Sequence, residues 1–134
     1  VSGSSYIKKI AIADQNPNYV YVTIGTSVVR YTDNMGAVPT AAWKYIYAPS
    51  SARINNLCVD PKDPKIIYVV SSGYGTNYRM GKYNGNDSTW TWMNAGLPNV
   101  PANTIEVDSN TKTLYLGNDI GLAGDAWLRV GFIF

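Results

Sequence analysis

A short strand, a turn and a second strand recur three times along this chain of 134 residues. The fullest copy spans residues 54–70, and the other two span residues 8–22 and 103–117. In each copy an apolar run ends on an aspartate, and a tyrosine follows seven or eight positions later in the second run. The aspartates are Asp14, Asp60 and Asp108, separated by 46 and 48 residues. This spacing predicts a repeated structural unit.

Each copy begins a longer unit of short strands joined by turns. The units cover about residues 6–52, 53–102 and 103–134. The third is only partial, because its expected third strand and acidic turn are compressed into residues 123–126. Four short strands per unit at this period are typical of a β-propeller blade, a small sheet that packs face to face with its neighbours. We therefore predict an all-β fold, a β-propeller segment of two to three four-stranded antiparallel blades that does not complete a ring.

The blade count leaves the state of the ring open. Closed propellers typically have about 4–8 blades, more than this chain supplies. Either the chain is a piece of a longer protein, or copies of it associate as a homo-oligomer that completes a propeller. The apolar end, residues 127–134, is expected to form a last strand, paired with another unit, with another chain or with this chain's own exposed blade.

Charge and residue types exclude several kinds of function. Eleven basic and nine acidic residues give a net charge of +2, too small a bias to predict binding to nucleic acid. No run of 18 apolar residues occurs, so insertion of a helix into a membrane is not expected. The chain has no histidine, and Cys58 is its single cysteine, so no internal disulfide, metal or cofactor is expected. Cys58 is interpreted as a buried, inert thiol.

Four segments carry a resemblance to a known family. They are VDPKDP at 59–64 followed by Tyr68 and Val69, YTDNMG at 31–36 with Trp43, YNGND at 83–87 with Trp90, and the connector GLPNVPANTI at 96–105. Over about residues 6–122 the chain resembles the BNR, or Asp-box, propellers. These include sialidases, xyloglucan-cleaving glycoside hydrolases, sortilin-type receptors and many secreted bacterial proteins. The resemblance implies the fold more strongly than an activity, and it implies a secreted or cell-surface location.

The aspartates are predicted to hold turns. A short carboxylate at the start of a turn can accept backbone N–H groups, and the resemblance implies the same role for an Asp-box aspartate, with a tryptophan packed beneath it. We assign this structural role to Asp14, Asp33, Asp60, Asp87 and Asp108. The tryptophans Trp43, Trp90 and Trp92 are predicted to pack between blades.

Glu106 is the sole glutamate and the only candidate for catalysis. It alternates with Ile105 and Val107 in the first strand of its unit, and first strands line the central channel of a propeller. Glycoside hydrolysis needs two carboxylates that flank the scissile bond, so a solvated strand residue is the simpler interpretation. The arginine cluster of sialidases has no counterpart here, and no residue matches the paired aspartates of the xyloglucan-cleaving enzymes. No catalytic residue is therefore assigned.

The aromatic content favours a binding function. Eleven tyrosines and four tryptophans are present, and sugar faces stack on exposed aromatic rings while polar side chains bind the hydroxyls. The Gly-rich loop at 72–78 offers Tyr74, Asn77 and Tyr78 as ligand contacts. We interpret the chain as a non-catalytic, secreted or cell-surface binding or scaffold module for carbohydrate or extracellular protein. The alternatives are a fragment of an Asp-box glycoside hydrolase and a self-assembling structural protein.

Overall fold

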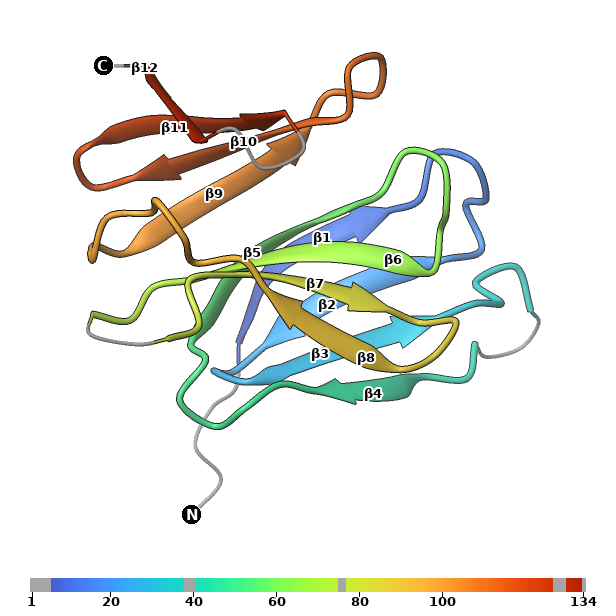
Figure 1. Ribbon diagram of the computed structural model, residues 1–134. Coiled ribbons are helices and arrows are strands. Elements are labelled where there is room, and N and C mark those ends of the chain that lie inside the picture. Colours follow the sequence, from blue (N-terminus) through green and yellow to red (C-terminus); the bar gives the residue numbers. More distant parts are fainter. Residues whose placement is uncertain (1–5, 38–40, 75–76, 127–129, 134) are drawn as a thin grey trace.

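The computed structural model describes residues 6–37, 41–74, 77–126 and 130–133, with side chains as far as Ile120 (Figure 1). The described residues form twelve strands and no helix. All neighbouring strands are antiparallel. They group into three four-stranded sheets in chain order, which confirms the predicted all-β class and antiparallel blades.

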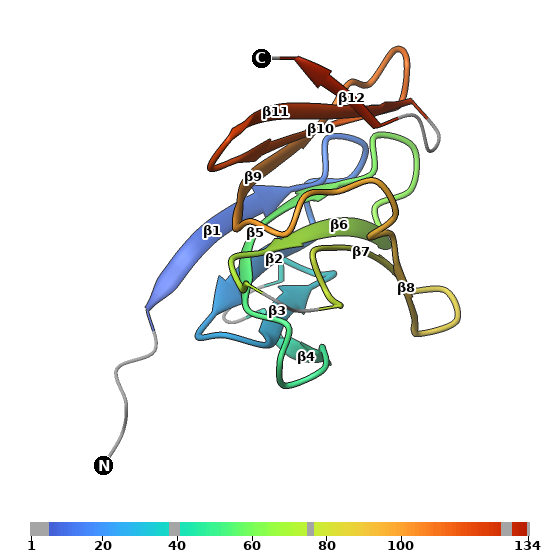
Figure 2. The same ribbon diagram turned by 60° about the vertical axis from the view of Figure 1, so that its left-hand side comes forward.

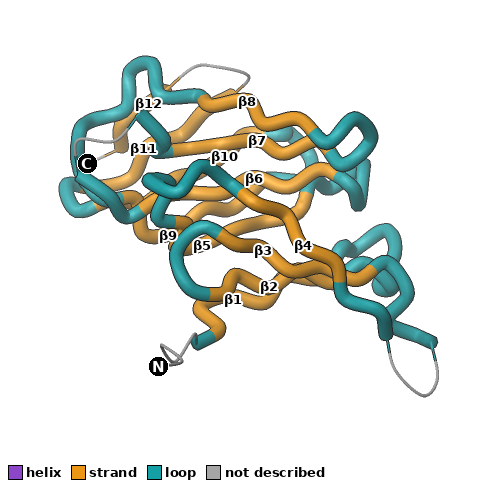
Figure 3. The backbone as a smooth tube through the Cα atoms, turned by 90° about the horizontal axis from the view of Figure 1, so that it is seen from below, coloured by secondary structure: helices purple, strands orange, loops and turns teal. Residues whose placement is uncertain are grey.

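The first sheet contains β1 (Ile7–Ile12), β2 (Val20–Ile24), β3 (Val28–Thr32) and β4 (Lys44–Tyr47). The second contains β5 (Ile54–Val59), β6 (Ile66–Ser71), β7 (Met80–Asn84) and β8 (Thr89–Trp92). The third contains β9 (Ala102–Val107), β10 (Thr113–Asn118), β11 (Gly121–Ala126) and β12 (Val130–Ile133). Loops join successive strands at the two ends of each sheet (Figure 3). At the β2–β3 turn the backbone φ of Gly25 is 64°, a conformation that glycine adopts without steric cost.

The second sheet lies between the other two, and both of its faces are covered (Figures 1 and 2). One buried cluster joins it to the first sheet through Tyr21, Val29, Ile46, Ile54, Leu57, Ile67 and Val69. The other joins it to the third through Cys58, Val70, Met80, Ala102, Ile105, Leu114 and Leu116. Burial of both faces explains why β6 is apolar at consecutive positions, since a strand covered on both sides shows no alternation.

The sheets stack with one repeated orientation. We call the face of a sheet that points to the next sheet along the chain its front face, and the opposite one its back face. Tyr21 pairs with Ala11, Tyr68 with Cys58 and Tyr115 with Glu106, so these three tyrosines share one register position on the front faces. Within the chain, front faces therefore pack on back faces twice.

The register corrects the sequence alignment of the first repeat. Asp60 donates its N–H to Ile66 O and Asp108 to Thr113 O, and in the first sheet the equivalent donor is Ala13, to Tyr19 O. Ala13, and not Asp14, thus occupies the repeated position. Proline spacing carries the signal that reveals this: Pro64 lies four residues after Asp60, and Pro17 lies four residues after Ala13.

Two of the three tryptophans pack as predicted between sheets. Trp90 and Trp92 stack with ring centroids 5.1 Å apart, and the Trp90 Nε1–H donates to Tyr47 O at 3.0 Å. Trp43 is exposed instead. It precedes β4 and alternates with Lys44, whose partner Tyr31 packs on the front face, so Trp43 lies toward the back face of the first sheet, which no described sheet covers.

The third sheet is fuller than the sequence predicts. Residues 121–126 form β11 instead of a compressed turn, and Val130–Ile133 pairs with it as β12. The remainder of the apolar end, residues 127–129 and 134, lies outside the described residues.

Candidate functional site

The β6–β7 loop, the β10–β11 turn and the start of β9 bring an exposed ring next to two polar side chains. Tyr74, in the β6–β7 loop, is 69% exposed, and its hydroxyl donates to Asp119 Oδ2 at 3.5 Å. The Asn103 amide donates to Asp119 Oδ1 at 2.7 Å. We call Tyr74, Asn103 and Asp119 the rim site. It offers an aromatic face beside a carboxylate and a carboxamide, the groups that recognise sugar rings and hydroxyls.

A repeated bulge positions Asn103. We call the first strand of each sheet, β1, β5 or β9, its inner strand. The pairing register shifts once in each inner strand, at Lys8 in β1, Asn55 in β5 and Asn103 in β9. The first two side chains each reach a backbone carbonyl of the next inner strand, Lys8 to Ile54 O and Asn55 to Asn103 O, both at 3.4 Å. Asn103 belongs to the last described sheet, and its side chain bonds to Asp119 instead.

The β10–β11 turn positions Asp119. Its geometry is supported by Asn118 Oδ1, which accepts the Ile120 N–H at 3.0 Å. Asn103 and Asp119 were not among the ligand contacts expected from the sequence. In the sequence, Asn103 follows the connector and Asp119 lies in an Asn-Asp turn. Both are ordinary places for turn residues, so nothing in the sequence marked them as ligand contacts.

The other two loop residues expected to bind ligand have different surroundings. Tyr78 packs its ring edge on Trp92, with centroids 4.9 Å apart and planes at 67°. The Asn77 carbonyl accepts a hydrogen bond from the side chain of Asn94. Residues 75–76 between Tyr74 and Asn77 lie outside the described residues. The ring contact of Tyr78 with Trp92 is a packing contact, and of the three loop residues only Tyr74 contacts Asp119 in the rim site.

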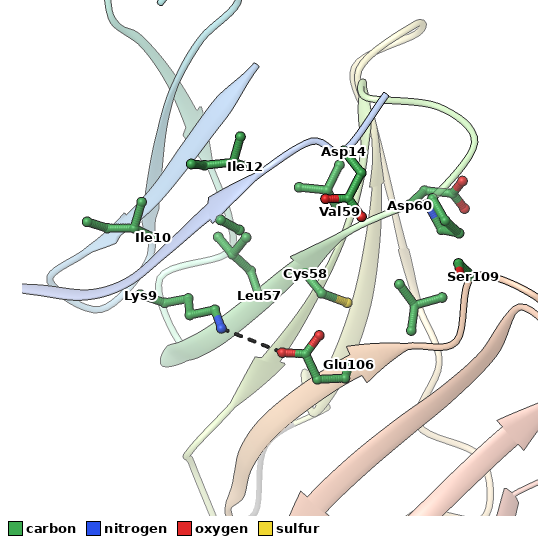
Figure 4. A pocket seen from close by; sticks show the side chains of 13 residues that line it. Lys9, Ile10, Ile12, Asp14, Leu57, Cys58, Val59, Asp60, Glu106 and Ser109 are labelled. Atoms are coloured by element: carbon green, nitrogen blue, oxygen red, sulfur yellow. Dashed lines mark ion pairs between the residues drawn. The ribbon is translucent and has the colours of Figure 1, made fainter. Parts of the chain in front are cut away.

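The inner strands of all three sheets enclose a second feature, an axial pocket of about 300 Å³ (Figure 4). Lys9 from β1 and Glu106 from β9 point toward each other across it, with Lys9 Nζ 3.6 Å from Glu106 Oε1. Asp14, Cys58 and Ser109 also line it. The position of Glu106 on an inner strand therefore agrees with the geometry expected for a channel-lining residue.

The surroundings of Glu106 favour binding or pairing over acid catalysis. A catalytic carboxylic acid usually needs apolar burial or a neighbouring carboxylate to stay protonated. The Glu106 side chain is 67% exposed, and its close partner is the ammonium of Lys9. Cys58 is also a poor nucleophile here, because burial raises the pKa of its thiol.

Asp60 and Asp108 each accept hydrogen bonds from turn amides. Asp60 Oδ1 accepts from the N–H groups of Lys62 at 2.8 Å and Asp63 at 3.2 Å, and its Oδ2 accepts from the Tyr68 hydroxyl at 2.8 Å. Burial opposes ionisation of Asp60, but these donors together hold its pKa below the ordinary value. Asp108 Oδ1 accepts from the N–H groups at positions 110 and 111, which lower its pKa.

The remaining predicted turn aspartates differ among themselves. Asp87 Oδ1 accepts from the Thr89 N–H at 3.2 Å and hydroxyl at 2.6 Å, within the β7–β8 hairpin. Asp33 pairs with Lys44 at 2.6 Å across the β3–β4 loop, and the hydrogen bond from this ammonium lowers its pKa. Asp14 lines the axial pocket, and no hydrogen bond to its carboxylate is found among the described residues.

Neither a metal site nor a membrane-spanning helix is found in the described part of the chain. No group of three or more Cys, Asp or Glu side chains there is arranged to hold a metal ion. No helix among those residues is long and apolar enough to cross a bilayer.

Three stacked four-stranded antiparallel sheets whose first strands face a common pocket define a protein of the β-propeller type. Among solved structures, the chain is similar to a GH74 enzyme of Niastella koreensis, with a TM-score of 0.73 and 17% sequence identity. The match covers 96% of this chain and 22% of that enzyme, so the chain spans about a fifth of its length. At this identity the likeness shows the fold alone. No family model and no curated protein matches the sequence.

Proposed function

We propose that this chain is a non-catalytic carbohydrate-binding segment of an Asp-box type β-propeller, and that it binds sugar at the rim site. The observation that carries the proposal is Tyr74, a strongly exposed ring whose hydroxyl lies 3.5 Å from Asp119 Oδ2, with the Asn103 amide on the same carboxylate. This contact favours one orientation of the ring and so reduces the conformational entropy lost when a sugar stacks on it. The Asp119 carboxylate then accepts hydrogen bonds from hydroxyl groups of the sugar.

The turn bonds of Asp87 and the paired tryptophans support the Asp-box part of the proposal. A secreted or cell-surface location follows from the proposed ligand, because polysaccharides are met outside the cell. Fractionation of the source organism's culture tests the location. Recovery of the protein in the cytosolic fraction alone contradicts it.

The binding test uses a glycan array followed by calorimetric titration of the best oligosaccharide. We expect Tyr74→Ala to weaken binding by about tenfold or more, which corresponds to about 1.4 kcal/mol. Tyr6→Ala is the matched control, because Tyr6 is also 69% exposed and lies outside the rim site. A blank array, or equal affinities for the two variants, contradicts the proposal.

A second candidate, a segment of a glycoside hydrolase, is favoured by the axial pocket. Glu106 on β9 and Asp14 in the turn after β1 both line it, and glycoside hydrolysis needs two carboxylates in one site. The described structural neighbour is itself an enzyme. Hydrolysis of xyloglucan that is lost in both Glu106→Gln and Asp14→Asn supports this candidate. Intact polysaccharide after incubation with the wild-type chain argues against it.

A further inference from the structure

No described sheet packs on the back face of the first sheet, where Ile10, Ile12, Tyr45 and Tyr47 are exposed while Val20 and Val22 are buried. Pairing places Ile10, Val22, Arg30 and Tyr45 in one row across this face, and Ile24, Val28 and Tyr47 in another. The Tyr45 and Tyr47 rings stack at 5.9 Å, and the Arg30 guanidinium lies 4.5 Å from the Tyr45 ring centroid. The Nε of Arg30 is buried without a hydrogen-bond partner among the described residues. The back face of the first sheet therefore exposes apolar side chains and holds one N–H donor, Arg30 Nε, that has no acceptor among the described residues.

Equivalent positions in the other sheets show what normally covers this face. Ile10, Leu57 and Ile105 share one register position in the three inner strands. Leu57 and Ile105 are 0% exposed, because the front face of the preceding sheet packs on them, whereas Ile10 is 58% exposed. One position further along the same face, Ile54 is 1% exposed and Ile7 is 54% exposed.

The third sheet presents the opposite, front-face surface, which is more polar than the two covered front faces because Glu106 stands at the position of Ala11 and Cys58. Its front face carries Thr104, Glu106 and Tyr115, and no described sheet packs on it. The three described sheets therefore leave one back face and one front face unpaired. These are the two halves of the interface that the chain already makes twice internally. An interface of this head-to-tail kind closes into a ring when the rotation per unit is correct.

We propose that the back face of the first sheet binds the front face of the third sheet of a second copy, and that two copies close a ring of six sheets. For the 134-residue chain by itself, the copy number is inferred from blade counts. Two copies supply six sheets, within the range of about 4–8 blades of known propellers, whereas one copy supplies three and three copies supply nine. The dimer contains two identical new interfaces related by a two-fold axis. This inference does not depend on the proposed carbohydrate binding.

Light scattering coupled to size exclusion tests the proposal on the wild-type chain at micromolar concentrations. We expect a dimer, twice the chain mass of 14.7 kDa. Ile10→Asp is expected to give a folded monomer, because it buries a carboxylate without a cationic partner in the new interface, whereas Glu106 on the other face is paired with Lys9. Ile120→Asp is the matched control, since Ile120 is 52% exposed in the β10–β11 turn and outside the two faces, and it is expected to stay dimeric.

Two further variants keep the test decisive. Tyr47→Asp changes a second exposed residue of the back face and is also expected to give a folded monomer. It replaces Ile10→Asp in the test if that variant fails to fold. Thr104→Arg alters the opposite, front face and is also expected to be monomeric. In a mixture of the two variants, the front face of Ile10→Asp and the back face of Thr104→Arg are both intact, so one normal interface can form and a heterodimer is expected. Pairing of two back faces would not give this result.

Other assemblies overturn the proposal. A folded wild-type monomer indicates that this face is covered by a blade outside the present chain. Masses that increase without limit indicate an open filament, and a dimer that survives both Ile10→Asp and Tyr47→Asp indicates a different interface.

Discussion

The hydrogen bond between Tyr68 and Asp60 joins a front-face tyrosine to the turn that ends the inner strand of the same sheet. Asp60 is only 6% exposed and accepts three hydrogen bonds, from two turn amides and this hydroxyl. A hydrogen bond to a charged group contributes about 1.5–3 kcal/mol, and the exposed turn amides recover part of this from water when the carboxylate is removed. We therefore expect Asp60→Ala to lower the free energy of unfolding by about 3 kcal/mol.

A double-mutant cycle separates the contribution of the Tyr68 hydroxyl to the free energy of unfolding from that of the turn amides. Tyr68→Phe should cost about 1.5 kcal/mol, because it removes the hydroxyl and leaves the ring in place. If the hydroxyl acts through Asp60, the double variant should be about as stable as Asp60→Ala alone, giving a coupling of about 1–1.5 kcal/mol. Urea unfolding followed by tryptophan fluorescence measures all four proteins.

Asp108→Ala provides the matched control. Asp108 occupies the same register position in the third sheet and accepts two amide bonds in a more exposed setting, so its loss should be smaller. Fully additive losses for Tyr68→Phe and Asp60→Ala would refute the reasoning, since they would mean that the two side chains stabilise the sheet independently.

Three more predictions concern packing, acid and the thiol. Gly81→Ala should lower the free energy of unfolding by about 1–3 kcal/mol, because the new Cβ would lie 2.6 Å from the Trp92 ring; the loss should shrink in a Trp92→Leu background, and an equal loss there would exclude the ring as the cause. The pKa values of Asp60 and Asp108 are lowered in the folded state. Their contribution to the free energy of unfolding is therefore fully present above the ordinary carboxyl range of about pH 4 and is lost as the pH falls through the folded pKa values. The urea midpoint should decrease below about pH 4, and it should decrease less in the Asp60→Ala variant. Cys58, buried and with a raised pKa, should react with a thiol reagent only in denaturant, and rapid labelling of the folded chain would contradict its placement.

The repeat predicted the architecture well because blade formation depends on local patterns. Short apolar runs separated by turns specify the strands, and their period specifies how many strands form a sheet. The alignment of the first repeat was wrong by one residue because it relied on an aspartate. The turn geometry depends on the backbone, which Ala13 satisfies as well as Asp60 does. Proline spacing, which reports backbone geometry directly, gives the correct register.

The rim site was less predictable for a physical reason. Tyr74 was identifiable as an aromatic residue in a long loop, but its partners Asn103 and Asp119 are 29 and 45 residues away in the sequence. Only the stacking of the third sheet on the second brings the three together. Tyr78 has the same residue type in the same loop, yet it packs on Trp92. Residue type and loop length alone cannot distinguish these two environments.

The position of Asn103 predicts that sugar binding and ring closure are linked. In the inner strands that have a following sheet, the bulge side chains of Lys8 and Asn55 reach a carbonyl of that sheet. If a second copy covers the front face of the third sheet, a backbone carbonyl of that copy competes with the Asp119 carboxylate for the hydrogen bond donated by the Asn103 amide. The carboxylate of Asp119 would then keep only the Tyr74 hydroxyl and be freer to accept sugar hydroxyls.

We therefore expect the dimer to bind oligosaccharide more tightly than the folded Ile10→Asp monomer, and by linkage we expect sugar to strengthen the dimer by the same factor. Asn103→Ala should abolish this difference in affinity while Tyr74 still binds. Titration of both oligomeric states with one oligosaccharide measures the coupling. Equal affinities for dimer and monomer would mean that Asn103 stays on Asp119 in both, and that the two surfaces act independently.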